Sequence, residues 1–386
     1  MDTINVIVTA LGWLAAGFWL WFGLRTARFL RGAVLTRRVS ASPTPAAWPK
    51  VSVIVPARNE AAAIGPCLQS LLALDYPALE VVAVNDRSND GTGEQMDRLA
   101  ARDPRLRCIH VQDLPAGWLG KTHAMHQGAS QASGEYLVFT DGDVLFAPQT
   151  LRIALRHTLG RELDHLCLLP KALPGGYWEN ALTYFMGMLF ILSVRPWAMA
   201  SNARSAYAGV GAFNLVRTGA YRAVGGYEAL RTEIIDDMRL GRAVKAAGGR
   251  SELLMGDDLL QVRWQVGVAG LINGVEKNSF AAMEFSWPYL LGFSALYLGL
   301  LAAPYVAVVQ SQGATGWLAA LAALNVLYAY WNQRAGTGAH AVFALPAAIV
   351  LCLWALWRSA VLITWRGGIR WRDTFYPLSF FKPERR

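Results

Sequence analysis

The chain has 386 residues, 54% of them hydrophobic, and its mean hydropathy is +0.27, which excludes a purely soluble protein. Its formal net charge is +9, and many basic residues flank the apolar stretches, which predicts contact with anionic lipid headgroups. The chain lacks the basic helix or aromatic-basic platform that would favour nucleic-acid binding.

The N-terminal apolar run is long enough to cross a bilayer. Residues 4–24 carry no charge, and the next fourteen residues contain five arginines and no acid. A signal peptide would carry its charge before the apolar core, so this order predicts an anchor with the following domain in the cytoplasm. We therefore assign residues 1–27 to a transmembrane anchor and 28–49 to a basic juxtamembrane linker.

Strand and helix patterns alternate with short connections through the central block, residues 50–285. This alternation predicts a parallel, wound α/β sheet. The expected strands are 51–56, 80–85, 106–111 and 135–140, and the expected helices are 60–74, 91–102 and 121–132. The cysteines in and beyond this block have no CxxC spacing and lie in apolar contexts, which favours buried thiols in a reducing compartment. They are Cys67, Cys108, Cys167 and Cys352.

The C-terminal third, residues 286–366, predicts about three further membrane helices, followed by a basic tail over 367–386. The expected apolar runs are 287–309, 315–331 and 341–364, the middle one being marginal. A further apolar segment at 178–200 contains Glu179 and Arg195, and an interfacial helix is favoured there over a membrane-spanning one. The tail should remain inside, whereas four spans place it outside, so the sequence leaves the topology open.

Carboxylates follow three of the predicted strands. Ligands of open α/β sheets bind at the carboxyl ends of the strands. The first strand exit carries Glu60, the second Asp86 and Asp90, and the third Asp141 and Asp143. Such clusters repel one another, and a divalent cation, Mg²⁺ or Mn²⁺, is the economical way to relieve the repulsion.

The Asp141-Gly142-Asp143 segment can bring two carboxylates to one ion, because the glycine allows a tight turn. The alternative is an ordinary Asp-rich turn. Lys121 begins a predicted helix and can neutralise a phosphate there, or it can be a solvated surface lysine. His123 and His126 lack a third metal ligand and are assigned as helix or pocket residues.

A second acidic segment precedes the helix that ends near Gly248. Helix capping explains one acid there, but Asp236 and Asp237 are adjacent. One of these carboxylates could accept the proton of an attacking hydroxyl. The upstream loop around Gly211 is built from small residues and suits close approach by a sugar.

Six motifs in this order resemble those of family 2 of the glycosyltransferases, which are inverting enzymes with the GT-A fold. They are VSVIVPARNE, VNDRSNDGT, GKTHAMHQG, FTDGDV, GAFNLVRTGAYRAVGGY and EIIDDMRLG, and they cover about residues 50–285. The resemblance implies a Rossmann-like, cytoplasmic GT-A domain. Together with the apolar runs, this is a GT-A domain with one N-terminal and about three C-terminal transmembrane helices.

The resemblance also implies roles for individual residues. Asp86 would contact the uridine or its equivalent, and Lys121 would face the diphosphate. Asp141 and Asp143 match the DxD-type pair, with Asp143 the direct metal ligand. Asp237, beside Asp236 in the catalytic pair, would be the base. The donor nucleotide would be held by Pro56, Ala57, Arg58, Glu60 and Asp141.

The chain departs from the family pattern at two places. Asn85 stands where many members have an acid. The processive and ceramide-type members carry a (Q/R)xxRW signature, of which this chain keeps only Arg263 and Trp264, which can be site residues or part of a core strand. The layout is most similar to bacterial hopanoid- and carotenoid-associated and ceramide-type lipid glycosyltransferases.

This similarity implies a nucleotide-diphosphate-sugar donor, with a UDP-sugar favoured, a lipid acceptor and a place in the bacterial inner membrane. A processive polysaccharide synthase and a non-enzymatic protein with a degenerate transferase domain stay open.

Overall fold

The computed structural model describes residues 3–39, 44–201, 203–310 and 314–381. The chain divides into two compact units. The first, the sheet unit, comprises Leu30–Leu173 and Val194–Arg263. The second, the helical unit, comprises Met1–Phe29, Pro174–Ser193 and Trp264–Arg386.

The sheet unit is built on a seven-stranded sheet with the strand order β3-β2-β1-β4-β8-β6-β9. The first four strands in the chain lie within two residues of their predicted positions, and three parallel pairings join them. The strands are β1 (Val51–Ala57), β2 (Leu79–Asp86), β3 (Leu106–Val111), β4 (Tyr136–Phe139), β6 (His165–Leu169), β8 (Asn214–Arg217) and β9 (Ser251–Met255).

The sheet is mixed, so the expectation of a parallel sheet holds only in part. Strand β8 runs antiparallel to both β4 and β6. A parallel neighbour needs a crossover connection, usually a helix packed on the sheet. The chain instead reaches β8 after a long excursion through the helical unit, and it enters the sheet from the opposite end.

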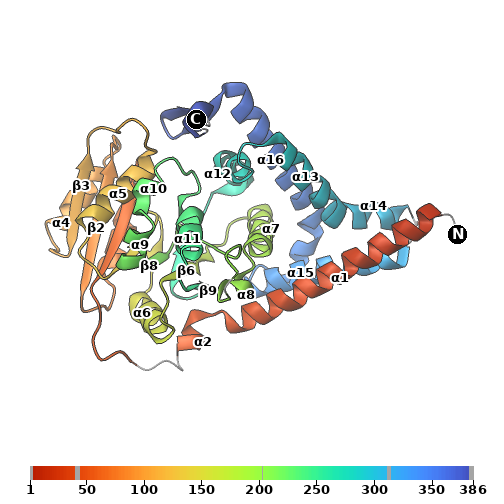
Figure 1. Cartoon of the computed structure of the whole chain (residues 1–386), viewed down its shortest axis with the longest axis horizontal. Helices are drawn as coiled ribbons and strands as arrows, with labels where there is room; N and C mark the ends of the chain where they lie inside the picture. Colours follow the sequence, from red (N-terminus) through yellow and green to blue (C-terminus); the bar gives the residue numbers. More distant parts are fainter. Residues whose placement is uncertain (1–2, 40–43, 202, 311–313, 382–386) are drawn as a thin grey trace. The chain divides into compact units, whose positions relative to one another are not determined.

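One face of this sheet is covered by α5, α9, α10 and α11, whose apolar side chains join those of the strands in one buried cluster. Its members include Ile54, Met125, Phe139, Val216, Tyr227 and Leu240. The helices of the sheet unit are α2 (Leu35–Val39), α3 (Ile64–Leu72), α4 (Thr92–Ala100), α5 (Gly120–Gln131), α6 (Thr150–Gly160), α8 (Pro196–Met199), α9 (Thr218–Ala223), α10 (Gly226–Ala229) and α11 (Asp236–Ala246). Figure 1 shows α5 and α10 against the strands.

A smaller sheet and the segment before β1 complete the sheet unit. Strand β10 (Leu260–Val262) lies between β5 (Leu145–Phe146) and β7 (Lys171–Ala172). The basic stretch predicted as a linker contributes α2, which packs on α6, and Val34 bridges to Met255 of β9. This stretch is therefore partly ordered on the sheet unit.

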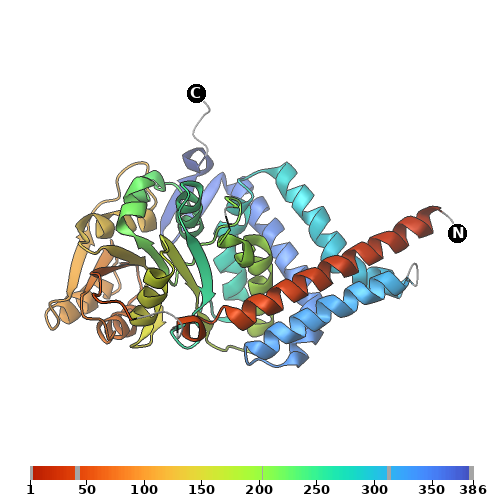
Figure 2. The same ribbon diagram turned by 60° about the horizontal axis from the view of Figure 1, so that its bottom comes forward.

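The helical unit consists mainly of long apolar helices. They are α1 (Thr3–Gly32, as far as Phe29), α7 (Tyr177–Val194), α12 (Gly267–Ala282), α13 (Trp287–Tyr297), which η1 (Leu298–Ala302) and α14 (Ala303–Val309) continue, α15 (Ala314–Arg334), η2 (Ala339–Ala344) and α16 (Leu345–Arg366). A hairpin of β11 (Gly368–Trp371) and β12 (Thr374–Pro377) follows, with α17 (Leu378–Phe381) after it. Helices α1 and α15 run side by side (Figure 2), and they cross where Gly12 faces the backbone of Trp317. Small residues at such crossings let membrane helices approach closely.

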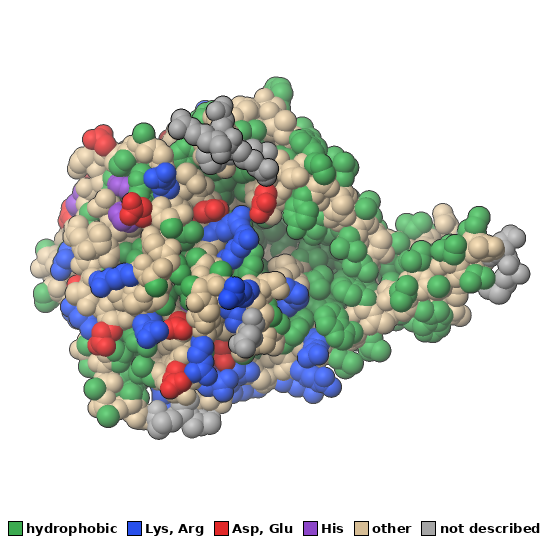
Figure 3. Space-filling view, in the orientation of Figure 1, with side chains coloured by type: hydrophobic (Ala, Val, Ile, Leu, Met, Phe, Trp, Pro, Cys, Tyr) green, Lys and Arg blue, Asp and Glu red, His purple; other side chains and the backbone are tan. Residues whose placement is uncertain are grey.

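Four helical segments in the described part of the chain are long and apolar enough to cross a membrane: Thr3–Gly32, Tyr177–Met199, Trp287–Val309 and Ala339–Arg366. The number agrees with the expectation, but the membership differs. The marginal run at 315–331, within α15, is not among these candidates, whereas the segment favoured as interfacial, 178–200, is. Figure 3 shows apolar side chains covering the surface of the long helices, with charged side chains gathered over the sheet unit.

Candidate functional site

The motif residues of the sheet unit meet at the carboxyl ends of β1, β2 and β4. At the centre is Lys121, in the first turn of α5. Its Nζ lies 2.8 Å from Asp141 Oδ1, after β4, and 3.6 Å from Asp236 Oδ1, at the start of α11. One cation is thus shared between two motifs that lie about a hundred residues apart in the chain.

The charges of this cluster are out of balance. Burial alone would lower the pKa of Lys121, but the carboxylates of Asp141, Asp236 and Asp237 outweigh it and raise that pKa. Desolvation, with the nearby Asp236 charge, raises the pKa of Asp237 above the usual aspartate range. Desolvation and the charges of Asp141 and Glu60 raise the pKa of Asp143 to about 6. These groups would gain from a further positive charge.

The two acids of the second segment begin α11, where the positive end of the helix dipole favours them. Buried Tyr227 donates its hydroxyl to Asp236 Oδ2 over 3.0 Å, and Asp237 Oδ1 accepts the Met238 N–H over 2.8 Å. Sequence reasoning missed Tyr227, although it lies in the quoted GAFNLVRTGAYRAVGGY motif. Asp236 is thereby fixed by two partners, whereas Asp237 is half-buried and can reach a substrate.

The candidate nucleotide site surrounds Asp86, which is buried at the end of β2. Arg87 donates to it through Nε (2.7 Å) and Nη2 (3.1 Å), and Arg58 Nη1 donates to its carbonyl oxygen over 3.2 Å. A Cβ at Gly120 would lie 2.4 Å from Asp86 Oδ2, so only glycine lets α5 begin this close to the carboxylate. No sequence pattern predicted the Asp86–Arg87 pair.

The end of β1 lies beside the Asp141-Gly142-Asp143 turn. A Cβ at Gly142 would lie 3.4 Å from the carbonyl oxygen of Pro56 and 3.9 Å from Cβ of Ala57, so the turn packs directly on this strand. Glu60 follows in a turn that Thr92 Oγ1 holds by accepting the Glu60 N–H over 2.9 Å. The predicted donor residues of β1 and the predicted metal pair therefore lie together.

The loop around Gly211 contacts Asp141 directly. The Asp141 N–H donates to Gly211 O over 2.9 Å, and a Cβ at Gly211 would lie 2.6 Å from Asp141 Oδ2. A glycine is needed here to leave room for the Asp141 carboxylate. The contact with Asp141 thus accounts for the small residue, which the sequence analysis had explained by close approach of a sugar.

Four candidate residues remain. Arg263 and Trp264 follow the end of β10 and are exposed, so the core-strand interpretation of this pair is wrong. His123 and His126 lie on α5, with ring centroids 5.4 and 4.9 Å from that of Trp118. Both are therefore helix residues, which is one of the two assignments that the sequence left open.

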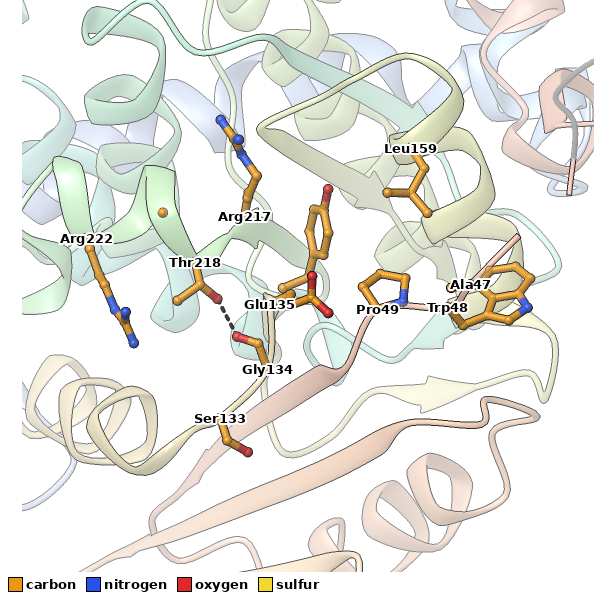
Figure 4. Close-up of a pocket in the computed structure, with 12 residues that line it drawn as sticks. Ala47, Trp48, Pro49, Ser133, Gly134, Glu135, Leu159, Arg217, Thr218 and Arg222 are labelled. Atoms are coloured by element: carbon orange, nitrogen blue, oxygen red, sulfur yellow. Dashed lines mark hydrogen bonds between the residues drawn. The ribbon is translucent and has the colours of Figure 1, made fainter. Parts of the chain in front are cut away.

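A surface cavity of about 670 Å³ lies at the other end of the strands (Figure 4). It is lined by residues that precede β1 and β4, such as Trp48 and Glu135, and by Arg217, Thr218 and Arg222. None of the predicted site residues lines it. The motif residues, not this cavity, therefore define the candidate site.

The comparisons with known proteins concern the domain that carries these residues. The model of the family described as "Glycosyl transferase family 2" matches residues 52–223. The chain contains a family 2 glycosyltransferase domain. Lys121, Asp141 and Asp143 fall inside the matched range, whereas Asp236 and Asp237 lie after it, on the element that Lys121 ties to the domain.

Curated relatives of this domain include the 4,4'-diaponeurosporenoate glycosyltransferases of Staphylococcus aureus. The chain is 26% identical to that of strain MRSA252 and 25% identical to that of strain USA300, each over 252 residues. The match spans 64% of this chain and 65% of each relative.

The fold of the glycosyltransferase domain is GT-A. A solved mannosyltransferase of Pyrobaculum calidifontis, in complex with GDP-Man and Mn²⁺, superposes with a TM-score of 0.56. It is 22% identical and covers 94% of this chain and 98% of its own. At this identity the likeness speaks for the fold alone.

The residues present fit a divalent cation only in part. Within the described residues, no group of three or more His, Cys, Asp or Glu side chains is arranged to hold a metal ion. Mg²⁺-type ions, however, are commonly bound through one or two carboxylates together with substrate phosphates. Asp141 and Asp143, whose charges repel each other, match that smaller donor set. Arg87 and Lys121 supply some of the positive charge that the sequence analysis assigned to a metal.

Proposed function

We propose that this chain is an inverting glycosyltransferase that moves a sugar from a nucleoside-diphosphate sugar to a hydroxyl group of a membrane lipid. The observation that carries the proposal is the Lys121 bridge between Asp141 and Asp236. It brings the predicted diphosphate side and the predicted acceptor side of the reaction to one point. The family match and the names of the relatives support the reaction class.

The reaction is a single in-line displacement. Asp237 takes the proton of the acceptor hydroxyl, and the acceptor oxygen forms a bond to the anomeric carbon. The bond from that carbon to the diphosphate oxygen breaks, and its electron pair leaves with the nucleoside diphosphate. Because attack and departure occur on opposite faces, the anomeric configuration inverts.

The positive groups of the site bind the donor's diphosphate. Lys121 lies at the N-terminus of α5, where backbone N–H groups also attract a phosphate. Asp143, with help from Asp141, would hold Mg²⁺ or Mn²⁺ against the same phosphates, and the bound ion would neutralise charge on the departing diphosphate. Asp86, held by Arg87 and Arg58, would face the nucleoside, with Pro56, Ala57 and Glu60 beside it.

The acceptor is proposed to be a lipid because the chain devotes a whole unit to apolar helices. A soluble acceptor would need no such unit. The arginines that follow the first apolar run favour a cytoplasmic sheet unit in the bacterial inner membrane. The relatives named for 4,4'-diaponeurosporenoate are consistent with an apolar acceptor.

Helix α7 is the proposed binding element for the lipid acceptor. Phe185 is fully buried and packs edge-on against Tyr328, so a change there would act through stability. Phe190 is only half-buried and is the better probe. We expect Phe190→Asn to raise the KM for lipid and to leave the KM for the sugar nucleotide unchanged; equal changes in both would contradict the idea.

The test uses the full chain in lipid vesicles with radiolabelled UDP- and GDP-sugars and a bacterial lipid extract. We expect one organic-extractable product, lost with EDTA and in Asp143→Ala. Label found only in polymer would support a processive synthase instead. No label with any donor would support a degenerate domain.

A further inference from the structure

Two polar side chains lie beneath the first turn of α11, in the interior of the sheet unit. His165 begins β6 and Asn214 begins β8, and both are fully buried. In the antiparallel register Asn214 pairs with Cys167, two residues from His165. Because side chains alternate along a strand, His165 and Asn214 share one face of the sheet. Val216 lies on that face and packs in the cluster that contains Leu240 of α11.

These two side chains form a hydrogen-bonded chain that ends on the proposed base. His165 Nε2 is bonded to Asn214 Oδ1, and Asn214 Nδ2 donates to the Asp237 carbonyl oxygen over 3.3 Å. An amide oxygen can only accept, so His165 Nε2 carries the hydrogen. The direction of both bonds is therefore set: imidazole to amide, and amide to the backbone of Asp237.

The environment of His165 keeps this direction fixed. Its Nδ1 is buried, and no polar atom of the described residues bonds to it. Burial lowers the pKa of His165, because a charged imidazolium would be desolvated there. The ring is accordingly neutral with its hydrogen on Nε2, and it cannot turn round without losing its one bond.

The backbone around Asp237 is closely packed and leaves no room for a shift of the contact between Asn214 and Asp237. A Cβ at Gly209 would lie 1.8 Å from the Asp237 carbonyl oxygen. A Cβ at Gly241 would lie 1.8 Å from Ala208 O and 3.2 Å from His165 Cε1. Helix α11 thus rests directly on the 208–209 backbone and on the imidazole, so a changed imidazole or amide moves the helix start as a whole.

We infer that His165 and Asn214 form a positioning relay that fixes the first turn of α11 and thereby aims the Asp237 carboxylate. The inference rests on the proposed role of Asp237 as the base. Neither relay residue touches substrate: Asn214 holds the backbone of the base, and His165 orients Asn214. The Tyr227–Asp236 bond fixes the neighbouring residue of the same turn, so the turn is held from two sides.

A residue that only fills the core would lower stability without a specific effect on turnover. A positioning relay predicts a loss in kcat with little change in the donor KM, because donor binding uses β1, β2 and α5. A misplacement of about 1 Å can cost about 100-fold in rate. We expect kcat to fall about 10- to 100-fold in His165→Leu and in Asn214→Leu.

The matched control is His157, a second buried histidine of the sheet unit. It lies on α6, and its Nε2 bonds to Glu252 over 2.9 Å, with no link to α11. His157→Leu should lower Tm and leave kcat within about twofold of the unaltered chain, within the usual spread for distant sites. His165→Gln, whose amide N–H can replace the Nε2–H, should restore most of the kcat that His165→Leu loses.

The experiment measures Tm, kcat and the donor KM for these variants, for the double variant His165→Leu/Asn214→Leu and for Asp237→Asn, all as full chains in lipid vesicles. In a relay the double variant is no slower than the slower single one, because either change breaks the same path. If His165→Leu does not fold, Asn214→Leu and His165→Gln supply the same comparison.

Two failures are distinguishable. If Asp237→Asn is inactive but the folded relay variants keep the kcat of the unaltered chain, the relay is overturned and the proposed function stands. The same conclusion follows if Asp237→Asn is inactive and the kcat losses of the two single variants multiply in the double variant. A fully active Asp237→Asn would overturn the proposed base and the relay together.

Discussion

The sheet unit contains two kinds of carboxylate cluster, and they differ in how their charge is compensated. At the carboxyl edge, Asp141, Asp236 and Asp237 share Lys121, and the pKa of Asp237 is raised. Away from that edge, Glu252 has a full set of partners. His157, Arg38 and Arg161 lie 2.9, 3.5 and 3.3 Å from it.

Glu80 belongs to the compensated kind. Burial alone would raise the pKa of Glu80 and of Glu252, but their hydrogen bonds and nearby positive charges outweigh it and lower both. Ser133 and Ser52 donate to Glu80, and Lys50 lies 3.9 Å away. Fully compensated carboxylates stabilise a fold, whereas an excess of negative charge costs stability and is kept where a ligand or a reaction uses it.

The largest expected effect is that of Asp237→Asn. A general base contributes about 10²–10⁴-fold in rate, so kcat should fall by that factor while the donor KM changes little. Stability should not fall. A carboxyl group with a raised pKa costs folding energy when ionised, and the neutral amide removes that cost above the ordinary aspartate pKa of about 3.9.

The measurement is single-turnover kinetics together with thermal unfolding at neutral pH. Asn Oδ1 can still accept the Met238 N–H, so the first turn of α11 should persist. A large drop in Tm with the loss of activity would mean that Asp237 is compensated, like Glu252, and would remove the contrast between the two kinds of site.

Lys121→Met should have the next largest effect. Removing the shared cation leaves three carboxylates facing one another and takes one donor from the diphosphate. Hydrogen bonds to charged groups contribute about 1.5–3 kcal/mol, so kcat/KM for the donor should fall about 10- to 100-fold. Lys50→Met is the control at the other edge, where Glu80 keeps its serine partners; a similar loss there would point to a general effect of charge.

Much of this arrangement could be predicted from the sequence, because local patterns determine it. The apolar runs predicted β1 to β4, and the acids at their ends predicted which edge carries the site. Lys121 at the start of α5 and Asp236 at the start of α11 follow from helix-start signals.

The remaining features depend on side-chain conformation and strand pairing, which the sequence pattern does not record. Tyr227 bonds to Asp236 nine residues later, and Arg87 takes both carboxylate oxygens of its chain neighbour Asp86, through side-chain geometry that only the structure shows. The antiparallel entry of β8 depends on the route of the chain through the helical unit. That strand also carries Asn214, so the relay could not be inferred before the pairing was seen.

Glu252→Gln tests a carboxylate whose charge is fully compensated. Its carboxylate joins β9 to α6 through His157 and Arg161, and to the segment before β1 through Arg38. The amide keeps the shape but loses the charge, and we expect about 2 kcal/mol of stability to be lost, as for charged hydrogen bonds in general. The kcat should be unchanged. Thermal unfolding and the lipid assay measure the two quantities, and a loss of kcat with an unchanged Tm would place Glu252 in the catalytic machinery.

The smallest expected effect is the pH dependence of the stability difference between the unaltered chain and Glu252→Gln. The pKa of Glu252 is lowered in the folded chain, so its stabilising contribution is complete above the unfolded glutamate pKa of about 4.3 and disappears as pH falls through the folded pKa. The Tm gap between the unaltered chain and Glu252→Gln should therefore be constant from neutral pH to about 5 and narrow below about 4.3. Comparing two variants cancels the titration of the other acids, provided they are distant. A gap that widened in acid would mean that folding raises the pKa of Glu252, as it does that of Asp237, and the contrast between the two residues would be lost.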